Sequence, residues 1–258
     1  MSGRRPDEIW QAAVDEGERR LTRGTWALAS TGFVGGADIM IGVLALTATT
    51  GALHEAVGAP IAHLAGSLLF GLGFVFLIIG RGELFTENFL VPVSAVLARR
   101  APRLSLLRLW LITFVANYAG ILLIVLLMAK TGVLEPATLE AAGPLTETLV
   151  ERDALAALFS GVLAGAVMTL MTWLTHAVEL DVSRILLCLG IGFVISVASM
   201  NHAVVSFGET MLAYVAGTTD AGLGEIARTI AFAIAGNLIG GLGLVTLNRG
   251  IQARGEPG

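Results

Sequence analysis

A short polar segment interrupts one of the longest apolar stretches of this chain. Residues 82–88 read Gly-Glu-Leu-Phe-Thr-Glu-Asn and lie between apolar stretches over residues 61–80 and 89–98. A lipid bilayer tolerates a charged, glycine-containing break at mid-depth only where protein or a water-filled cavity surrounds it. Such broken helices mark substrate paths, because the interrupted backbone offers free N–H and C=O groups to a solute. A second break, Ser-Met-Asn-His at residues 199–202, follows later. Two such breaks favour a pore or transporter.

The composition places the chain in a membrane. It is 55% hydrophobic and 14% charged, with a mean hydropathy of +0.80, which lies outside the range of soluble globular proteins. A membrane helix needs about 20 apolar residues, so we predict six spans in one all-α membrane domain. They are residues 26–48, 61–98 with the first break, 108–129, 155–177, 185–216 with the second break, and 227–247.

The distribution of charge predicts the orientation of these spans. The connection at residues 99–108 carries four arginines and no acidic residue, so the positive-inside rule places it in the cytoplasm. The connection at residues 130–153 is rich in Asp and Glu, as expected outside. Six spans then put both termini in the cytoplasm.

Three segments are expected along the chain. Residues 1–24 form a cytoplasmic amphipathic helix, residues 25–248 the pore domain and residues 249–258 a cytoplasmic tail. Pro6 and the two acidic residues after it favour a helix start. This helix lies on the membrane, packs on a neighbouring subunit, or is a solvated, minor element, and we favour the last. The single Cys188 excludes disulfides within one chain, and no metal or other cofactor is expected.

The two halves of the chain share motifs in the same order. Gly-Phe-Val-Gly-Gly-Ala at residues 32–37 matches Gly-Val-Leu-Ala-Gly-Ala at residues 161–166, and Asn-x-x-Gly recurs at Asn117 and Asn237. Three spans repeated after three spans enter the membrane from opposite sides, which predicts an inverted repeat. The small residues in these motifs also allow close helix approach.

His202 is the strongest candidate for chemistry, since an ionisable group at depth in a membrane is expensive and functional by default. Its ordinary pKa near 6.5 allows it to gain or lose a proton close to neutral pH. The neighbouring Asn201 either orients the ring or binds solute, or it serves helix packing.

The first break offers a different set of groups. Thr86 presents a hydroxyl to the lumen, and Leu84 and Phe85 form an apolar constriction. Glu83 is expected to accept hydrogen bonds from the interrupted backbone, and Asn117 and Asn237 to cap the broken ends. Four further charges are costly in lipid and must be paired, interfacial or exposed to a vestibule, with Arg81 and Glu87 a possible pair. These charges are Asp38, Arg81, Glu87 and Glu209.

Together, the Glu-Leu-Phe-Thr segment at residues 83–86, Asn201-His202 and Gly-Asn-Leu-Ile-Gly-Gly at residues 236–241 resemble the formate/nitrite transporter (FNT) family over residues 25–248. The resemblance implies an aquaporin-like fold with one pore per subunit, a homopentamer, and a bacterial inner (cytoplasmic) membrane. It also implies transport of a small monovalent anion or its neutral acid. The implied pore residues are the central His202, Thr86, a constriction at Leu84 and Phe85, and another near Phe74 and Ile195.

The chain also departs from the family pattern. Glu87 stands where a small residue is usual, Asp38 replaces an apolar one, and no lysine appears near the pore in spans four and five. Since Glu87 and Asp38 would repel an approaching anion, a pore for a small neutral solute stays open as an alternative. An intramembrane enzyme is disfavoured, because no nucleophile motif accompanies His202. No nucleic-acid partner is expected.

Overall fold

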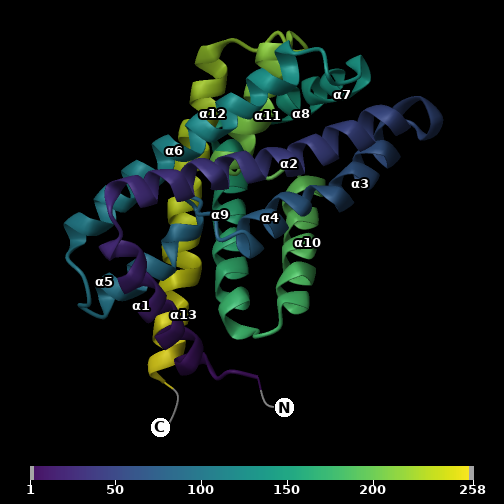
Figure 1. Cartoon of the computed structure of the whole chain (residues 1–258). Helices are drawn as coiled ribbons and strands as arrows, with labels where there is room; N and C mark the ends of the chain where they lie inside the picture. Colours follow the sequence, from purple (N-terminus) through teal and green to yellow (C-terminus); the bar gives the residue numbers. More distant parts are fainter. Residues whose placement is uncertain (1–2, 256–258) are drawn as a thin grey trace.

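The computed structural model describes residues 3–255, which form helices joined by short connections and contain no strand (Figure 1). Within these residues, five helical segments are long and apolar enough to cross a membrane. The one predicted span not among these five, residues 185–216, is interrupted at the second break. It consists of α10 (Asp181–Val197) and α11 (Ala203–Ala216). The expected all-α fold is therefore confirmed. The five segments are α2 (Thr25–Val57), α3 with α4 (Ala59–Ile79), α6 (Arg103–Lys130), α9 (Ala154–Ala177), and the last segment, from α12 to α13 (Leu223–Arg254).

The remaining elements lie at the two ends of the bundle. In Figure 1, α1, α5, α13 and the turn from α9 to α10 gather at one end, and α7, α8 and the connection from α11 to α12 gather at the other. We call these the α1 end and the α7 end. The elements not yet bounded are α1 (Pro6–Thr22), α3 (Ala59–Phe70), α4 (Leu72–Ile79), η1 (Glu87–Phe89), α5 (Val91–Leu97), α7 (Pro136–Glu140), α8 (Ala142–Val150), α12 (Leu223–Leu238), η2 (Ile239–Thr246) and α13 (Leu247–Arg254).

The N-terminal helix α1 is not a solvated, minor element, and that interpretation was wrong. Its apolar side chains, Ile9 and Val14 among them, are buried within the same chain. At Gly17 a Cβ would lie 2.1 Å from the carbonyl oxygen of Val91, so α1 touches the backbone of α5. The segments 1–24 and 249–258 extend beyond the described residues at 1–2 and 256–258.

The connection at residues 130–153 contains α7 and α8, which the sequence analysis missed. These short helices pack against α2 and α11. A Cβ on Gly51 would lie 2.3 Å from the carbonyl oxygen of Ala137, and one on Gly143 would lie 2.3 Å from that of Thr218. The connection is therefore a packed cover over the α7 end.

The repeated glycine motifs lie at close helix crossings. A Cβ on Gly36 would lie 2.0 Å from the carbonyl oxygen of Asn117, where α2 crosses α6. A Cβ on Gly165 would lie 2.3 Å from that of Asn237, where α9 crosses the last span. The matched motifs thus contact each other in the same way in each half, as an inverted repeat requires.

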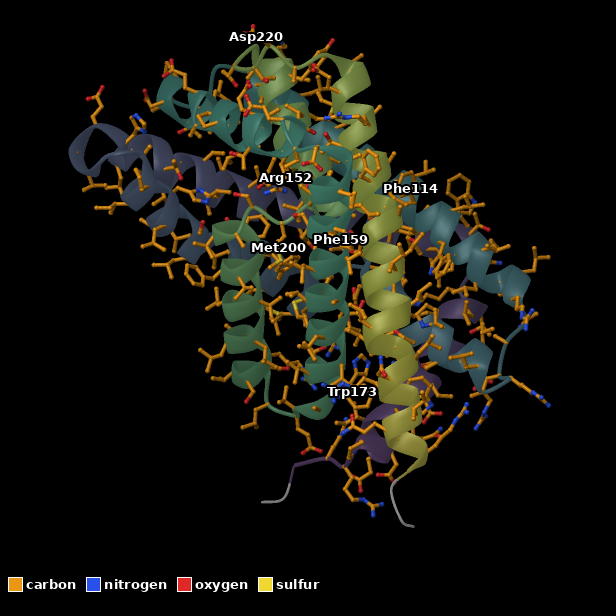
Figure 2. All side chains as sticks on the ribbon, turned by 180° about the vertical axis from the view of Figure 1, so that it is seen from behind. Phe114, Arg152, Phe159, Trp173, Met200 and Asp220 are labelled. Atoms are coloured by element: carbon orange, nitrogen blue, oxygen red, sulfur yellow. The ribbon has the colours of Figure 1, made fainter. Side chains whose placement is uncertain are left out.

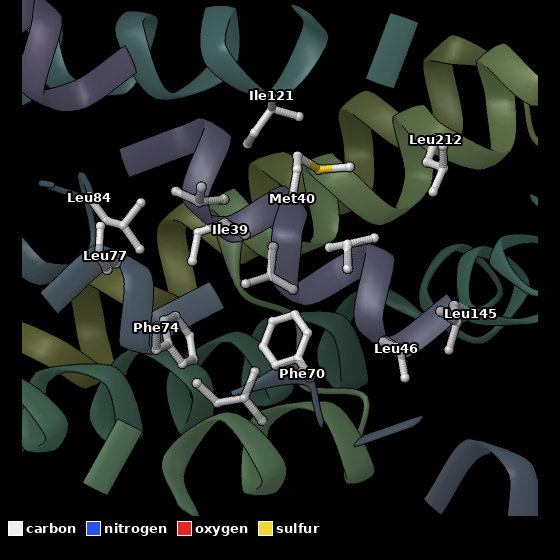
Figure 3. Packing of buried hydrophobic residues seen from close by; sticks show 14 of the residues in the cluster. Ile39, Met40, Leu46, Phe70, Phe74, Leu77, Leu84, Ile121, Leu145 and Leu212 are labelled. Atoms are coloured by element: carbon white, nitrogen blue, oxygen red, sulfur yellow. The ribbon is translucent and has the colours of Figure 1, made fainter. Parts of the chain in front are cut away.

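An apolar cluster lies at the centre, between the two halves. It includes Phe70, Phe74, Leu84 and Ile195, all at most 1% exposed, and Figure 3 shows part of it. The chain bends at Gly71 between α3 and α4, where a Cβ would lie 2.5 Å from the Cα of Leu189 in α10. The two interrupted spans therefore meet closely in the middle of the bundle.

We expect Gly165→Ala to disrupt folding. The added methyl group would overlap backbone atoms of Asn237, which cannot move aside as a flexible side chain could. Gly190→Ala in α10 is the matched control, since a Cβ there meets nothing within 4 Å. Helix propensity alone would favour alanine at either position by about 1 kcal/mol. The measurement is folded yield and thermal stability in detergent. Equal yields of the two variants would contradict the close crossing.

Candidate permeation site

The second break is tied to the last span by the amide of Asn237. Its Oδ1 accepts from the backbone N–H of Ala203 at 2.9 Å. Its Nδ2 donates to the carbonyl oxygens of Asn201 at 3.0 Å and Gly161 at 2.8 Å. One buried side chain thus satisfies three backbone groups, two at the second break and one in α9.

The first break has the same arrangement around Asn117. Its Oδ1 accepts from the N–H of Phe85 at 2.8 Å, and its Nδ2 donates to the carbonyl oxygens of Glu83 at 2.8 Å and Gly32 at 2.7 Å. Each contact has its counterpart at the second break, with Glu83 corresponding to Asn201. By this correspondence, the residue matched to His202 is Leu84.

His202 is the N-cap residue of α11 and is fully buried. Its Nδ1 accepts from the N–H of Val205 at 3.2 Å, which leaves Nε2 as the protonated nitrogen of the neutral ring. Nε2 is buried without a hydrogen-bond partner among the described residues, as are Oγ of Ser206 and Oγ1 of Thr86. Buried polar atoms in proteins are nearly always hydrogen-bonded, so these three suit a partner from outside the chain.

Most of the hydrogen bonds of Asn201 join it to neighbouring helices and stabilise the fold. Its backbone N–H donates to Oγ of Ser160 at 2.9 Å, and its Nδ2 donates to the carbonyl oxygens of Thr229 at 3.1 Å and Ala157 at 3.3 Å. Only its Oδ1 lacks a partner among the described residues.

The structure separates Leu84 from Phe85. Leu84 belongs to the central cluster together with Phe74 and Ile195. The ring of Phe85 instead makes edge-to-face contacts with Trp110, at 6.2 Å between centroids, and with Phe114, at 5.4 Å. Phe85 therefore also packs on α6, and the constriction expected from Leu84 and Phe85 stays a prediction.

The acidic residues of the first break bind arginines from the N-terminal segment. Glu87 accepts from Arg20 at 2.9 Å, and its suggested pairing with Arg81 was wrong. Glu83 pairs with Arg23 and lies 3.7 Å from Arg20, and the described contacts of its carboxylate include no backbone N–H. The expected capping role of Glu83 was wrong as well, because the side-chain amide of Asn117 accepts from the backbone N–H at this break.

Arg20 is the centre of this ionic cluster. Its guanidinium also donates to Oδ1 of Asn88 at 3.0 Å and to Glu16 at 3.0 Å, and the residue is 8% exposed. Burial lowers the pKa of Arg20, but the carboxylates of Glu87 and Glu83 outweigh burial and raise it above its usual value. The guanidinium is therefore permanently charged and offsets the acidic charge at the break.

A cavity opens at each end of the bundle beside one of the breaks. The α1-side cavity has a volume of about 450 Å³ and is lined by Gly82, Glu83 and Glu87 of the first break, among others. The α7-side cavity has a volume of about 710 Å³ and is lined by Ser199 of the second break, with His63 from α3.

Arg152 is a site residue that the sequence analysis missed. It donates to the carbonyl oxygen of Ser199 at 2.7 Å and to Oγ of Ser160 at 3.0 Å, and Figure 2 shows it beside Met200. Burial lowers the pKa of Arg152, and the carboxylate of Glu209 partly offsets this effect. The signal was available, because Arg152 precedes Gly161 by the same spacing as Arg23 precedes Gly32.

The two other unexplained acids lie beside the breaks. Oδ2 of Asp38 is buried without a hydrogen-bond partner among the described residues, 3.1 Å from where a Cβ on Gly82 would lie. Glu209 is 7% exposed in α11 and is near enough to Arg152 to interact electrostatically.

The sequence model of the formate/nitrite transporters matches residues 7–249. The chain belongs to the formate/nitrite transporter family. Members of this family are channels and transporters, not enzymes. The chain is 28% identical over 258 residues to the uncharacterized transporter YrhG of Bacillus subtilis (strain 168), covering 96% of this chain and 92% of that protein.

Solved structures of the family share the fold. An FNT family ion channel superposes with a TM-score of 0.83 at 16% identity, covering 94% of this chain and 98% of that one. A pentameric formate channel with formate bound superposes with a TM-score of 0.73 at 18% identity, covering 88% and 96%.

We expect Glu87→Gln to weaken the docking of α1, since it leaves the buried Arg20 guanidinium short of a counter-charge. Breaking a buried ion pair costs about 3–5 kcal/mol, whereas replacing both partners is far milder. The double variant Arg20→Met with Glu87→Gln should therefore be less destabilised than the sum of the single changes. Thermal unfolding of the four proteins measures this coupling.

Arg19→Gln is the matched control, because the Arg19 side chain is 74% exposed and its ion pair within residues 3–255 is with Glu16. It should leave the unfolding temperature unchanged. Additive effects of Arg20→Met and Glu87→Gln would contradict the coupling.

Proposed function

We propose that this protein is a channel for a small monovalent anion or its neutral acid, of the formate or nitrite kind, assembled as a homopentamer. Family membership and the structural likeness to a pentameric formate channel with formate bound support this proposal. The observation that carries it is a group of three buried polar atoms at and near the two breaks that have no hydrogen-bond partner among residues 3–255. They are Nε2 of His202, Oγ1 of Thr86 and Oγ of Ser206.

The proposed path joins the two cavities through the centre of the bundle. Phe74, Ile195 and Leu84 supply an apolar section in which a hydrated ion is unfavourable. The polar atoms of His202 and Thr86 serve as hydrogen-bonding positions along the path. The cavities provide wide, wet approaches on either side.

Energetics favour passage of the permeant as the neutral acid through the narrow section. Bringing an ion into a low-dielectric site costs several kcal/mol even after relaxation. A helix N-terminus stabilises a nearby anion by about 0.3–1 kcal/mol, and by up to about 2 kcal/mol when the site is partly buried. The N-terminus of α11 at His202 therefore helps an anion approach without removing the penalty, whereas a proton that accompanies the anion removes the charge.

His202 acts in this scheme as a neutral hydrogen-bond donor. Its Nδ1 accepts from the N–H of Val205, and a doubly protonated ring would lose this bond, because both of its nitrogens are donors. The Nε2–H then donates to the oxygen of the permeant. The proton that neutralises the permeant comes from the solvent in the cavities, not from the ring.

We propose that the α1 end faces the cytoplasm of a bacterial inner membrane, with both termini inside. The arginine-rich connection at residues 99–108 supports this orientation by the positive-inside rule. The acidic connection at residues 130–153, with α7 and α8, then lies outside.

The test of the function is a flux panel in proteoliposomes with formate, nitrite and glycerol, with and without a pH gradient. We expect formate and nitrite to pass and glycerol to be excluded, with the anions moving faster toward the alkaline side. Glycerol flux without anion flux would establish the neutral-solute pore instead. The pairing of Glu87 with Arg20 weakens the charge argument that favoured such a pore.

We expect His202→Asn to assemble normally but to transport about 10- to 100-fold more slowly. Asparagine is also a good N-cap residue, so α11 keeps its start. The variant lacks the Nε2 donor, and leaving a buried oxygen of the permeant without its hydrogen bond costs about 1–3 kcal/mol. Flux across pH 5 to 8 should keep the shape of the wild-type profile, because the proton travels with the permeant.

Gln252→Asn is the control, since Gln252 is exposed in α13 and lines neither of the two cavities. A variant at His202 that loses the pH dependence would show that the ring itself carries the proton, and the donor role would be abandoned.

A further inference from the structure

The α1-side cavity has an unusual content of charge. Its lining includes six arginines and four carboxylates, so positive charge exceeds negative charge by two. The arginines come from the residues before α1, from α1 itself, from the segment that follows it, from the first break and from α10. They are Arg4, Arg19, Arg20, Arg23, Arg81 and Arg184, and the acids are Asp15, Glu16, Glu83 and Glu87.

Five of these six arginines are engaged by the protein. Arg20, Arg23 and Arg19 bind the acids of the cavity wall. Arg4 donates to the carbonyl oxygen of His176 at 2.8 Å, and Arg184 donates to Asp181 at 2.7 Å.

Arg81 differs from the other five. Its side chain makes no hydrogen bond or ion pair with residues 3–255, and the residue is exposed within the cavity lining. It is the unpaired cation of the described part of this cavity. It also lies at the break itself, two residues before Glu83.

The backbone of Arg81 is held in a left-handed conformation, with φ of 63°. This conformation costs a residue other than glycine roughly 1–2 kcal/mol. Ser199, at the matching position of the second break, has φ of 45° and lines the α7-side cavity. Each break therefore turns one residue toward the cavity on its own side, and at the α1 side that residue carries a free positive charge.

We propose that Arg81 is the anion-docking residue of the α1-side cavity, which captures small monovalent carboxylates and inorganic anions before they enter the narrow section. A free guanidinium presents paired N–H donors that match the two oxygens of formate or nitrite. The inference rests on the proposed anion channel and adds a residue at its α1-side mouth.

The test compares formate uptake into right-side-out and inside-out membrane vesicles at low ionic strength. Arg81→Gln should raise the half-saturating formate concentration at the α1 side by about two- to fivefold, the range of an exposed ion pair. Half-saturation from the α7 side and the maximal rate should stay at wild-type values. High salt should remove the difference, because the Debye length falls to about 3 Å at 1 M.

Three further variants separate charge from backbone effects. Arg81→Lys keeps the charge and should stay close to wild type, whereas Arg81→Gly relaxes the left-handed turn and should behave like Arg81→Gln. Arg99→Gln is the matched control, because Arg99 is a second exposed arginine with a left-handed backbone, φ of 59°, outside this cavity. It should be indistinguishable from wild type.

The possible failures are distinct. If the wild-type protein transports formate and Arg81→Gln has the same half-saturating formate concentration at the α1 side, the docking role is overturned and the channel function is left intact. Wild-type behaviour of Arg81→Gly alone would assign the effect to the backbone and also overturn it. Wild-type vesicles that pass neither formate nor nitrite would refute the proposed function and, with it, the docking role.

Discussion

The pore depends on two asparagine side chains that satisfy the backbone at its two breaks. In a hydrocarbon environment each unpaired N–H or C=O group costs several kcal/mol, so a broken helix needs a partner at the break. Asn117 and Asn237 each provide one acceptor and two donors to backbone groups of the break and of a neighbouring span. Because these bonds fix the course of the chain through each break, they also determine where His202 and Thr86 lie.

Most of the fold could be predicted from the sequence, since hydrophobicity and small-residue spacing act locally along the chain. The six spans, the two breaks and the pairing of glycine motifs all follow from such patterns. The helices α7 and α8 were missed because the connection that contains them is short of long apolar runs. The docking of α1 was missed because its apolar side chains are few, and contacts with elements distant in sequence bury them, namely α5, α6, α9 and α13.

The ionic partners of the site were the least predictable part. Arg81 and Glu87 are close in sequence, yet Glu87 pairs with Arg20, which lies 67 residues away along the chain. Leu84 and Phe85 are neighbours in sequence, yet Leu84 packs in the central cluster and Phe85 also packs on α6. Arg152 and Arg23 stand at matching positions of the repeat, so the sequence contained a signal for Arg152. That signal becomes clear only from the contacts in the structure, where Arg23 pairs with Glu83 and Arg152 donates to Ser199.

The position of α1 has a consequence for how the protein is made. Its residues leave the ribosome first, yet they contact the first break, α5 and finally α13, where a Cβ on Gly250 would lie 2.9 Å from the ring of Trp10. The contacts of this helix are therefore complete only after the last span has been inserted. A chain truncated before α13 during synthesis lacks one of the surfaces on which α1 packs, even when its earlier spans are in place.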